Sequence, residues 1–437
     1  MSDFLGAGPP RREASPRADE RSPKPPSPDR QRIRPPSPSL TSRRALDWFV
    51  FFLADVQTGF GAFVSVYLTT EKWTQTDIGL VLTAGAIVGL VGQIPGGAVV
   101  DAARSQRWVA AAAIAAVGIS AFALAMSPIF VVVFASRILQ AGASCVLGPV
   151  IAAISLGLVG HKGISTRLGR NAAFASVGSG VAAAGMGASA YYISNRAAFI
   201  LAASMTVPAL FALFQIRTHE IDPARAHGGV AKSGQGNAIA GLLSLFEIRP
   251  LLVFAGCIAL FQLANAAMLP LAASVMTLRS AKFATILVAT SIVAPQLIVA
   301  VLSPLFGRKA DQWGRRPLLV LCFAALAIRG LLFAFLTNPY LLMAAQLLDG
   351  VSGAALAVLV PLIIADVAGA SGHFNLAQGA VGCAVGIGAS ISTTLAGSVS
   401  DRFDSPTAFL MMAGFGFLGL AAVWLAMPET RPNDEGG

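Results

Sequence analysis

The chain alternates between long apolar stretches and short polar breaks. Twelve of the stretches are long enough to cross a bilayer core as a helix, which takes about 20 apolar residues. The breaks carry turn signals such as Ser127-Pro128 and Thr337-Asn338-Pro339. The pattern predicts an all-α integral membrane protein. The predicted helices occupy residues 46–69, 76–99, 107–127, 129–158, 171–193, 197–216, 250–274, 283–306, 317–336, 339–367, 376–399 and 406–427.

A longer polar stretch, residues 217–249, separates the sixth predicted helix from the seventh. It contains the sequence HGGVAKSGQGN, which is typical of a loop. We interpret it as a cytoplasmic linker between two six-helix bundles, residues 45–216 and 250–428. The segment AIAGLLSLFEI within the linker predicts a short interfacial helix.

The two ends of the chain have a different composition. Residues 1–44 hold ten Lys/Arg, five Asp/Glu and ten prolines, with PPSP repeated at 25–28 and 35–38. Such a segment cannot bury enough apolar surface to fold, so we expect a disordered cytoplasmic tail. It either contacts anionic lipid or a regulatory partner, or is a solvated tail that sets the topology. It lacks the apolar core of a signal peptide. Residues 429–437 form a short C-terminal tail.

Composition supports the membrane assignment. The chain is 55% hydrophobic and 12% charged, and a soluble domain of 437 residues has too little interior for so much apolar sequence. The net charge of +10 is concentrated in the N-terminal tail and the inner loops, so no nucleic acid partner is expected. The four cysteines lie in apolar runs without metal-ligand spacing, and we expect packing residues and no metal site.

Lysine and arginine are distributed unevenly between the two sides of the predicted membrane protein. With a cytoplasmic N-terminus, the inner loops and C-terminal tail hold fourteen Lys/Arg and the outer loops hold five. Because cytoplasmic loops are the more basic ones, both termini are predicted to be cytoplasmic in a multi-pass plasma (inner) membrane protein.

The two predicted bundles repeat one another. GGAVVDAARSQR after the second helix matches FGRKADQWGRR after the eighth, and ASRILQAGASCVLGPVIAAIS in the fourth helix matches AAQLLDGVSGAALAVLVPLIIAD in the tenth. Both pairs are offset by about 210 residues. Parallel repeats of this kind imply two bundles around a central axis with a site between them near the midplane, which is the geometry of a transporter.

Asp55 and Arg137 lie well inside predicted helices of the first bundle. Asp55 is about 14 Å into its helix at 1.5 Å per residue, and Arg137 reaches about 12 Å from the outer side. An ion at this depth is costly, so it is paired or in contact with water. A carboxylate there can take up a proton on one side and release it on the other, with Arg137 tuning its affinity. The alternative is that the two residues only satisfy one another.

Other polar residues lie at comparable depth. For the amides, contact with substrate and hydrogen bonding between helices are both open. Arg329 and Asp349 come from consecutive antiparallel helices at a depth that suits pairing, and we favour a structural ion pair, with Asp349 the better functional candidate. The predicted substrate cavity consists of Gln57, Gln140, Gln262, Asn265 and Asp349.

The loop GRKADQWGRR, residues 307–316, carries a different chemistry. Gly307 permits a close helix approach, and Asp311 can accept hydrogen bonds from backbone N–H groups at a neighbouring helix N-terminus. Arg315 and Arg316 can hold carboxylates or lipid phosphates. Such bonds can form and break as two bundles rock, so we interpret the loop as a conformational latch.

This loop resembles the signature loop of the major facilitator superfamily. The second half has Gly307-x-x-x-Asp311-x-x-Gly314-Arg315-Arg316, the most specific part of a resemblance that covers residues 45–428. The first half keeps only the start of the signature. Its latch residues are Gly97, Asp101, Arg104, which replaces the second glycine, and Arg107, which stands in for the basic pair.

Arg137-x-x-Gln140-Ala141-Gly142 resembles the superfamily's helix 4 motif, with Ala141 in place of glycine. The resemblance implies twelve helices in two bundles and transport by alternating access. The drug:proton antiporter branch uses a helix 1 acid and this arginine in proton coupling, which matches Asp55 and Arg137. That branch also has a Gly-Pro pair in helix 5, which ASVGSGVAAAGMGASA lacks.

No enzyme is expected, because the four histidines are scattered in loops and no phosphate-binding glycine loop precedes a Lys-Ser/Thr pair. We therefore expect a secondary transporter that uses a gradient and no cofactor, with a small molecule, protons and lipid as partners, acting as a monomer. Proton-coupled efflux by antiport is favoured. Proton-coupled uptake by symport is the alternative, and a membrane receptor or scaffold that transports nothing is the second alternative.

Overall fold

The structure is a computed structural model that describes residues 38–58, 64, 67–68, 70–226, 243–279, 284–371 and 373–431. The chain divides into two units, Met1–Pro36 and Ser37–Gly437, and every described residue belongs to the second. Most of the predicted N-terminal tail and residues 227–242 of the predicted linker lie outside the described residues.

The described part of the first half is entirely helical apart from its turns. Proline and glycine stand at its turns and kinks, as the breaks in the apolar pattern predict. Its elements are α1 (Leu40–Thr58), α3 (Gln75–Val91), α4 (Gln93–Ala102), α5 (Gln106–Met126), α6 (Phe130–Tyr192), α7 (Asn195–Gln215), the 3₁₀ turn η1 (Thr218–Glu220) and α8 (Pro223–Ala226).

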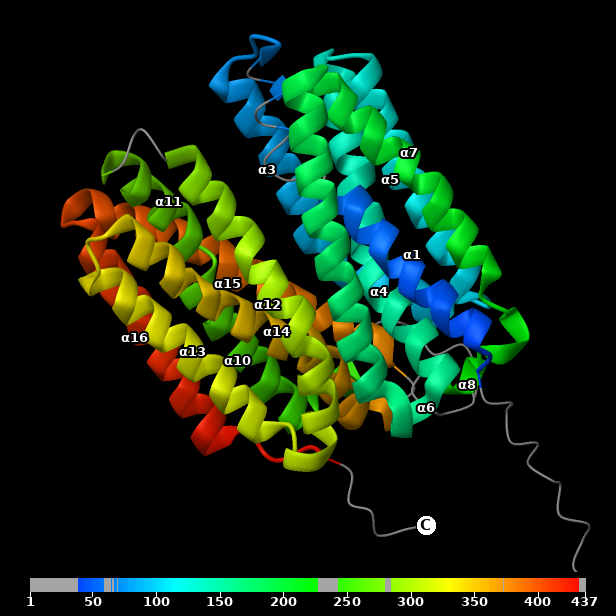
Figure 1. Cartoon of the computed structure of the whole chain (residues 1–437). Coiled ribbons are helices and arrows are strands. Elements are labelled where there is room, and N and C mark those ends of the chain that lie inside the picture. Colours follow the sequence, from blue (N-terminus) through cyan, green and yellow to red (C-terminus); the bar gives the residue numbers. More distant parts are fainter. Residues whose placement is uncertain are drawn as a thin grey trace, which may run out of the picture. The chain divides into compact units, whose positions relative to one another are not determined.

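The described part of the second half is also helical between its turns. Figure 1 shows its helices gathered in one group and those of the first half in another. Its elements are α10 (Arg249–Asn265), α11 (Met268–Arg279), α12 (Ala284–Trp313), α13 (Arg316–Phe335), α14 (Pro339–Ala368), the 3₁₀ turn η2 (Gly369–Ser371), α15 (Phe374–Arg402) and α16 (Ser405–Ala426).

Nine helices of the described residues are long and apolar enough to cross a membrane, and the bent pair α3 and α4 is a tenth. α6 has 63 residues, about twice what one crossing needs, so it supplies two of the predicted spans. With α1, which covers the start of the first predicted span, the helices account for all twelve predicted segments.

α6 differs from the prediction at its centre. The sequence analysis left residues 159–170 as a loop between the fourth and fifth helices, but these residues are helical on both sides of Gly160. Gly160 has φ 66° and ψ 179°, a conformation that an L-residue rarely adopts, and it turns the chain between the two spans. The fifth helix therefore begins about ten residues earlier than predicted.

Two other predicted helices are broken near a proline. The second predicted span consists of α3 and α4, which are bent by 47° at Gly92. Pro95 follows and has no N–H to donate to the preceding turn. The seventh span is likewise divided into α10 and α11, with Pro270 in the first turn of α11.

One buried apolar core lies within the first half, and the other fills the second half and extends onto α6 of the first half at Ala152, Leu156, Ile164 and Leu168. The halves meet where α6 packs against α12 and where α4 packs against α15. Both contacts lie at the end of the helices at which Asp101, Ser165, Asp311 and Asn375 are found. We call this end the gate end.

Candidate functional site

The Arg137 site lies on α6 in the first half. The Arg137 guanidinium donates to Gln140 Oε1 at 2.8 Å, and Gln140 Nε2 donates to Ser144 Oγ at 3.0 Å. Gly85 on α3 faces the guanidinium, and a Cβ built there would lie 3.2 Å from Arg137 Nη2. Glycine at this position therefore makes room for a cation inside the bundle.

Asp55 belongs to α1, which packs against α6. Its side chain lies outside the described residues, so the predicted contact with Arg137 stays a prediction. Gln57 on the same helix is half-buried. Gln140, which was predicted in the substrate cavity, lies beside Arg137, in agreement with the i, i+3 spacing of the helix 4 motif.

The Arg329 cluster lies in the second half. Arg329 is 1% exposed, and its guanidinium donates to Asp349 Oδ1 and to Asn265 Oδ1. Met268 Sδ lies 3.2 Å from Arg329 Nη2, and Gln346 Nε2 lies 3.4 Å from Asp349 Oδ2. The predicted pairing of Arg329 with Asp349 is confirmed. A buried guanidinium is tolerated here because a carboxylate and an amide oxygen satisfy it.

Asp349 and Asn265 were expected in the substrate cavity, and the structure places both against Arg329. The Asp349 side chain is still 32% exposed, so one of its faces is open. Gln262 lies one turn before Asn265 on α10, beside Gly388 of α15. Of the predicted cavity residues, Gln140 therefore lies beside Arg137, whereas Asn265 and Asp349 lie against Arg329.

Asp101 joins the two halves at the gate end. Its carboxylate accepts hydrogen bonds from the Leu376 N–H at 2.8 Å, the Asn375 N–H at 3.4 Å and the Asn375 side-chain amide at 2.8 Å. α15 has no side-chain cap of its own at His373. Asp101 therefore caps the N-terminus of α15 from the other half, where free N–H groups and the helix dipole favour an anion.

Asp311 makes the second contact between the halves. The Ser165 hydroxyl, near the start of the fifth span, donates to Asp311 Oδ2. The prediction that Asp311 accepts from backbone N–H groups at a helix N-terminus is wrong. In the described part of the chain, Asp311 accepts from the Ser165 hydroxyl, and the N–H groups at the start of α15 donate to Asp101 instead. A Cβ at Gly307 would lie 2.5 Å from the Ser165 carbonyl oxygen, and a Cβ at Gly97 would overlap the Asn375 carbonyl oxygen. The two motif glycines therefore permit the backbone contact that both carboxylates complete.

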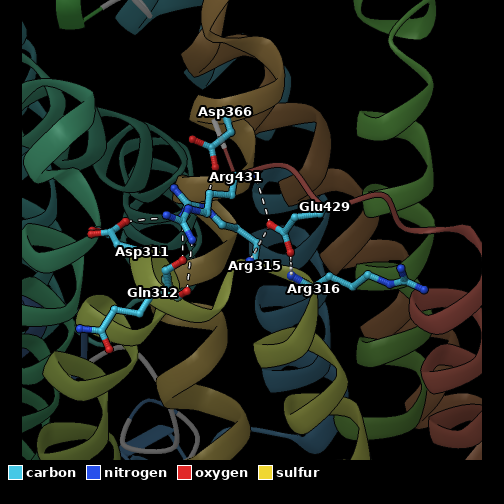
Figure 2. Close-up of polar contacts among 9 residues, drawn as sticks. Asp311, Gln312, Arg315, Arg316, Asp366, Glu429 and Arg431 are labelled. Atoms are coloured by element: carbon cyan, nitrogen blue, oxygen red, sulfur yellow. Dashed lines mark hydrogen bonds and ion pairs between the residues drawn. The ribbon is translucent and has the colours of Figure 1, made fainter. Parts of the chain in front are cut away.

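Arg315 connects α12 with α14, as Figure 2 shows. Its Nε donates to Asp366 Oδ2 at 2.8 Å, and its Nη1 donates to the Ala310 carbonyl at 2.8 Å and lies 3.5 Å from Asp311 Oδ1. The side chains of Arg315 and Asp366 are 5% and 3% exposed. The carboxylate partner that the sequence predicts for Arg315 is thus Asp366, a residue that sequence reasoning did not single out.

Glu429 caps α13 from the C-terminal end of the chain (Figure 2). Its carboxylate accepts from the Arg315 N–H at 2.8 Å and the Arg316 N–H at 3.1 Å, and α13 has no side-chain cap of its own. Gly314 has φ 90°, and a Cβ there would collide with the Glu429 carboxylate. The second glycine of the signature is therefore required both by its backbone conformation and by the approach of Glu429. Arg316 donates to the Trp424 carbonyl and lies over the Trp424 ring at 5.8 Å.

The first-half loop uses its basic residues differently. Arg107 donates to the Ile216 carbonyl at 2.7 Å and lies over the Phe214 ring at 5.4 Å, so it binds the end of α7. Arg104 is exposed. The two signature loops therefore share the glycine and the aspartate but not the network around the arginines.

Sequence reasoning missed the Asp47 ion pairs. Asp47 on α1 is 1% exposed and accepts from Arg167 Nη2 at 2.6 Å and from Arg170 Nη2 at 2.6 Å. The Arg167 side chain is 5% exposed and that of Arg170 is 55% exposed. Both arginines were expected in an inner loop, because the fifth helix was predicted to start after them. Their i, i+3 spacing in RLGR was the signal that they share one helix face.

Glu220 ties the start of α1 to the end of the first half. It accepts from the Ser39 N–H and the Ser39 hydroxyl, both at 3.0 Å, and Arg217 lies 3.7 Å away. Burial disfavours the charged form of Glu220, but the hydrogen bonds from Ser39 and Ser42 and the charge of Arg217 outweigh it and lower its pKa. Glu220 is therefore an anion at neutral pH, as its position requires.

Among the residues that the structure describes, no group of three or more His, Cys, Asp or Glu side chains is placed to hold a metal ion. The described polar residues of the site are joined by ion pairs, hydrogen bonds and contacts with helix N-termini.

The sequence is similar to a known family and to proteins within it. The sequence profile described as Major Facilitator Superfamily matches residues 48–294 and 255–437. An uncharacterized MFS-type transporter of Mycobacterium tuberculosis (strain CDC 1551 / Oshkosh) is 36% identical over 396 residues, which cover 90% of this chain and 94% of that protein. A second strain of the same organism, ATCC 25618 / H37Rv, has a relative with the same values.

Solved structures share the fold at low sequence identity. The transporter FucP, crystallised in the outward conformation, has a TM-score of 0.72 at 16% identity and covers 88% of this chain and 98% of its own. The proton:xylose symporter XylE has a TM-score of 0.67 at 16% identity and covers 90% of this chain and 96% of its own.

Proposed function

The chain belongs to the Major Facilitator Superfamily of secondary transporters, and on this premise we propose that it exports a small molecule in exchange for protons. The observation that carries the proposal is the Arg137 guanidinium inside the first bundle, next to Gln140 and in a space that Gly85 leaves open. A cation kept at this depth favours the ionised form of a nearby carboxylate, and α1, which holds Asp55, packs against the same helix.

The contacts at the gate end support alternating access. Asp101 and Asp311 each bond to the opposite half, so both contacts must break before the gate end can open. The conformation described here has the gate end closed. If this end faces the cytoplasm, as the distribution of basic residues predicts, the predicted substrate cavity is open toward the outside in this conformation.

Proton exchange follows from competition at Asp55. Protonation removes its attraction to Arg137 and changes the relative free energies of the two conformations. A substrate that binds one conformation better than the other then displaces the proton, and the two ligands cross in opposite directions. We assign the proton site to Asp55 and its tuning to Arg137, and we assign the bonds that hold the gate to Asp101 and Asp311.

Two other functions are open to test. Proton-coupled uptake uses the same residues, and XylE, which shares the fold, is a proton symporter. A receptor or scaffold on the same fold has no need of a charge inside the bundle, so Arg137 argues against it. The plasma membrane location, with both termini in the cytoplasm, is part of this proposal.

Proton release from the purified protein distinguishes these functions. The protein in weakly buffered detergent solution is mixed with members of a substrate panel, and the pH change is recorded for wild type, Asp55→Asn and a control, Asp401→Asn, at an exposed aspartate. Antiport requires release from wild type and from the control and none from Asp55→Asn. Proton uptake on binding would assign symport, and transport without any proton change in all three proteins would overturn proton coupling.

A further inference from the structure

A basic cluster lies in the first half, near the gate end, where α1 packs against the fifth span of α6. Four arginines surround one carboxylate there. Asp47 receives hydrogen bonds from Arg167 and Arg170, and Arg167 also donates to the Arg43 carbonyl at 3.2 Å. Arg44 follows on the same turn of α1. The cluster therefore carries more positive than negative charge, and no step of the proposed transport cycle uses it.

The excess positive charge of the cluster is exposed, whereas its carboxylate is not. Arg170 is exposed, and Arg43 and Arg44 are exposed and form no ion pair within the part of the chain that the structure describes. Asp47 is buried. Glu220, which binds the start of α1, has an arginine of its own at 3.7 Å. A ligand that reaches this surface from outside the protein therefore meets a net positive charge.

Aromatic side chains continue this surface away from the gate end. Trp48 on α1 is exposed, and its ring lies 5.5 Å from the Phe51 ring, 5.9 Å from the Phe52 ring and 6.2 Å from the Phe174 ring of α6. The Arg170 guanidinium lies 5.5 Å from the centre of the Phe174 ring. At 1.5 Å per residue, the rings begin about 6 Å, one helical turn, beyond the arginines on both helices.

The two helices run in the same direction at this surface. Asp47 pairs with Arg170, and further along both helices the Phe51 carbonyl lies against Gly178. The arginines of both helices therefore occupy one level, and the aromatic rings occupy a second level further from the gate end. The boundary between phosphate headgroups and acyl chains has the same order, with cations outside and amphipathic rings beneath them.

Tryptophan marks this level elsewhere on the molecule. Trp48, Trp108, Trp313 and Trp424 are exposed, and all lie near the gate-end termini of their helices. The fifth tryptophan, Trp73, lies at the opposite end, where its Nε1 donates to a backbone carbonyl of the turn before α6. Exposed tryptophan is enriched where headgroups meet hydrocarbon. The gate end therefore lies at the headgroup level of one leaflet, and the basic cluster lies at the same level.

We propose that this surface binds an anionic phospholipid, with its phosphate on the exposed arginines and its acyl chains on Trp48 and the neighbouring rings. A phosphodiester accepts hydrogen bonds from guanidinium groups, and its charge complements that of the cluster. With the gate end in the cytoplasm, the ligand comes from the cytoplasmic leaflet, which is rich in anionic lipid. Contact with anionic lipid, which the sequence left open for residues 1–44, is thus assigned to the last two arginines of that segment. The inference goes beyond the proposed function and does not depend on the substrate or direction of transport.

The test follows Trp48 fluorescence of the full-length protein in bilayers. Substitution of Trp73, Trp108, Trp313 and Trp424 by phenylalanine leaves Trp48 as the single reporter. The protein is reconstituted into phosphatidylcholine with a rising fraction of phosphatidylglycerol, and in two series one or the other lipid carries bromine on its acyl chains. Because bromine quenches tryptophan on contact, the two series give the affinity of phosphatidylglycerol at this position relative to phosphatidylcholine.

The proposal requires phosphatidylglycerol to bind at least about fivefold more tightly, which is the effect of a single basic residue near an anionic membrane surface. Substitution of Arg43, Arg44 and Arg170 together by glutamine leaves a neutral buried pair and should bring the two affinities to within about twofold. Arg44→Gln, whose side chain holds no other described element, should lower the preference without affecting folding. The matched control Arg308→Gln, an exposed arginine at the gate end of the second half, should leave it unchanged.

Two further measurements distinguish a lipid site from a site for a soluble phosphate compound. High salt should reduce the preference, since attraction between exposed charges is screened. Glycerophosphoglycerol, which is the same headgroup without acyl chains, should not displace phosphatidylglycerol at millimolar concentration, because the contact of the chains with the aromatic rings is missing.

Equal affinity of the two lipids at Trp48 in the otherwise unchanged reporter protein would overturn the inference. A preference that neither Arg44→Gln nor the triple substitution reduces, or that Arg308→Gln reduces equally, would show that the cluster is not its source and would also overturn it. Displacement by glycerophosphoglycerol would assign the arginines to a soluble phosphate compound instead of a lipid. None of these results bears on proton exchange at Asp55, which is tested separately.

Discussion

At the scale of single residues, the buried charges of this transporter differ in how many partners they have. Asp47 receives hydrogen bonds from two arginines, and Arg170 approaches it with two nitrogens, Nε and Nη2, in a bidentate geometry. Arg329 has a carboxylate and an amide oxygen. Such groups are tolerated because each charge is balanced, and removing one member leaves the other buried and uncompensated.

Asp47→Asn is therefore expected to destabilise the protein more than Arg170→Gln. The substitution leaves the Arg167 guanidinium, which is 5% exposed, without its counter-ion, and the expected loss is about 3–5 kcal/mol. Arg170 is 55% exposed, so its removal should cost less than about 1 kcal/mol. Thermal unfolding in detergent, followed by intrinsic fluorescence, compares the two midpoints. Equal midpoints would show that burial does not govern this ion pair.

At the scale of helices, carboxylates from distant parts of the chain cap helix starts that lack a cap of their own. Asp101 caps α15 and Glu429 caps α13. The start of α1 differs, because the Ser39 hydroxyl caps it by accepting from the Ser42 N–H at 3.2 Å, and Glu220 in turn accepts from the Ser39 N–H. Glu220 and Glu429 are separated by 209 residues, close to the offset of the sequence repeat, so the two halves place an acid at equivalent positions.

The contact of Glu220 with Ser39 is expected to depend on pH. Because the native pKa of Glu220 is lowered, its stabilising effect is complete above the unfolded value of about 4.3 and is lost as the pH falls through the lower native value. Hydrogen exchange at the amides of Ser39 to Arg43 should thus accelerate in acid relative to Glu220→Gln. The ratio of wild-type to variant exchange rates removes the intrinsic pH dependence, and a ratio constant between pH 7 and about pH 3 would contradict the assignment.

At the scale of the whole molecule, two pairs of helices from opposite halves close the gate end. α4 meets α15 and α6 meets α12, each at a glycine that allows backbone contact. The motif carboxylates complete these contacts with a few hydrogen bonds, which is a small free energy compared with the apolar cores of the halves. Separation of the halves at this end breaks these hydrogen bonds and also removes the α6 side chains Ile164 and Leu168 from the core of the second half.

Asp101→Asn is expected to shift the population toward a conformation that is open at the gate end. An amide oxygen is a weaker acceptor than a carboxylate at a helix N-terminus, and the charge that complements the helix dipole is lost. Nitroxide labels at the exposed residues Lys162 and Arg308, one in each half, report the change by pulsed electron paramagnetic resonance. The distance distribution should gain a longer component in the variant. A control with Asp401→Asn should match wild type, and an unchanged distribution in Asp101→Asn would contradict its role in holding the gate.

The sequence analysis predicted the membrane-spanning helices, the division into two halves and the pairing of Arg329 with Asp349. Each of these follows from a local property: the length of an apolar run, a repeat offset, or the depth of a residue along its helix. It was wrong about residues 159–170, because a single glycine with positive φ makes the turn and the polar residues around it remain helical. That error also hid the buried partners of Asp47.

The sequence by itself determined that this chain is a multi-pass helical transporter of two related halves, because a bilayer demands apolar helices of a set length and duplication leaves a readable repeat. Only the tertiary structure decided which charges pair. The donors of Asp101 are 274 and 275 residues away, and Asp366 lies 51 residues from Arg315. Such contacts depend on how helices are rotated and how closely glycines let them approach, and neither quantity is encoded in the spacing along one helix.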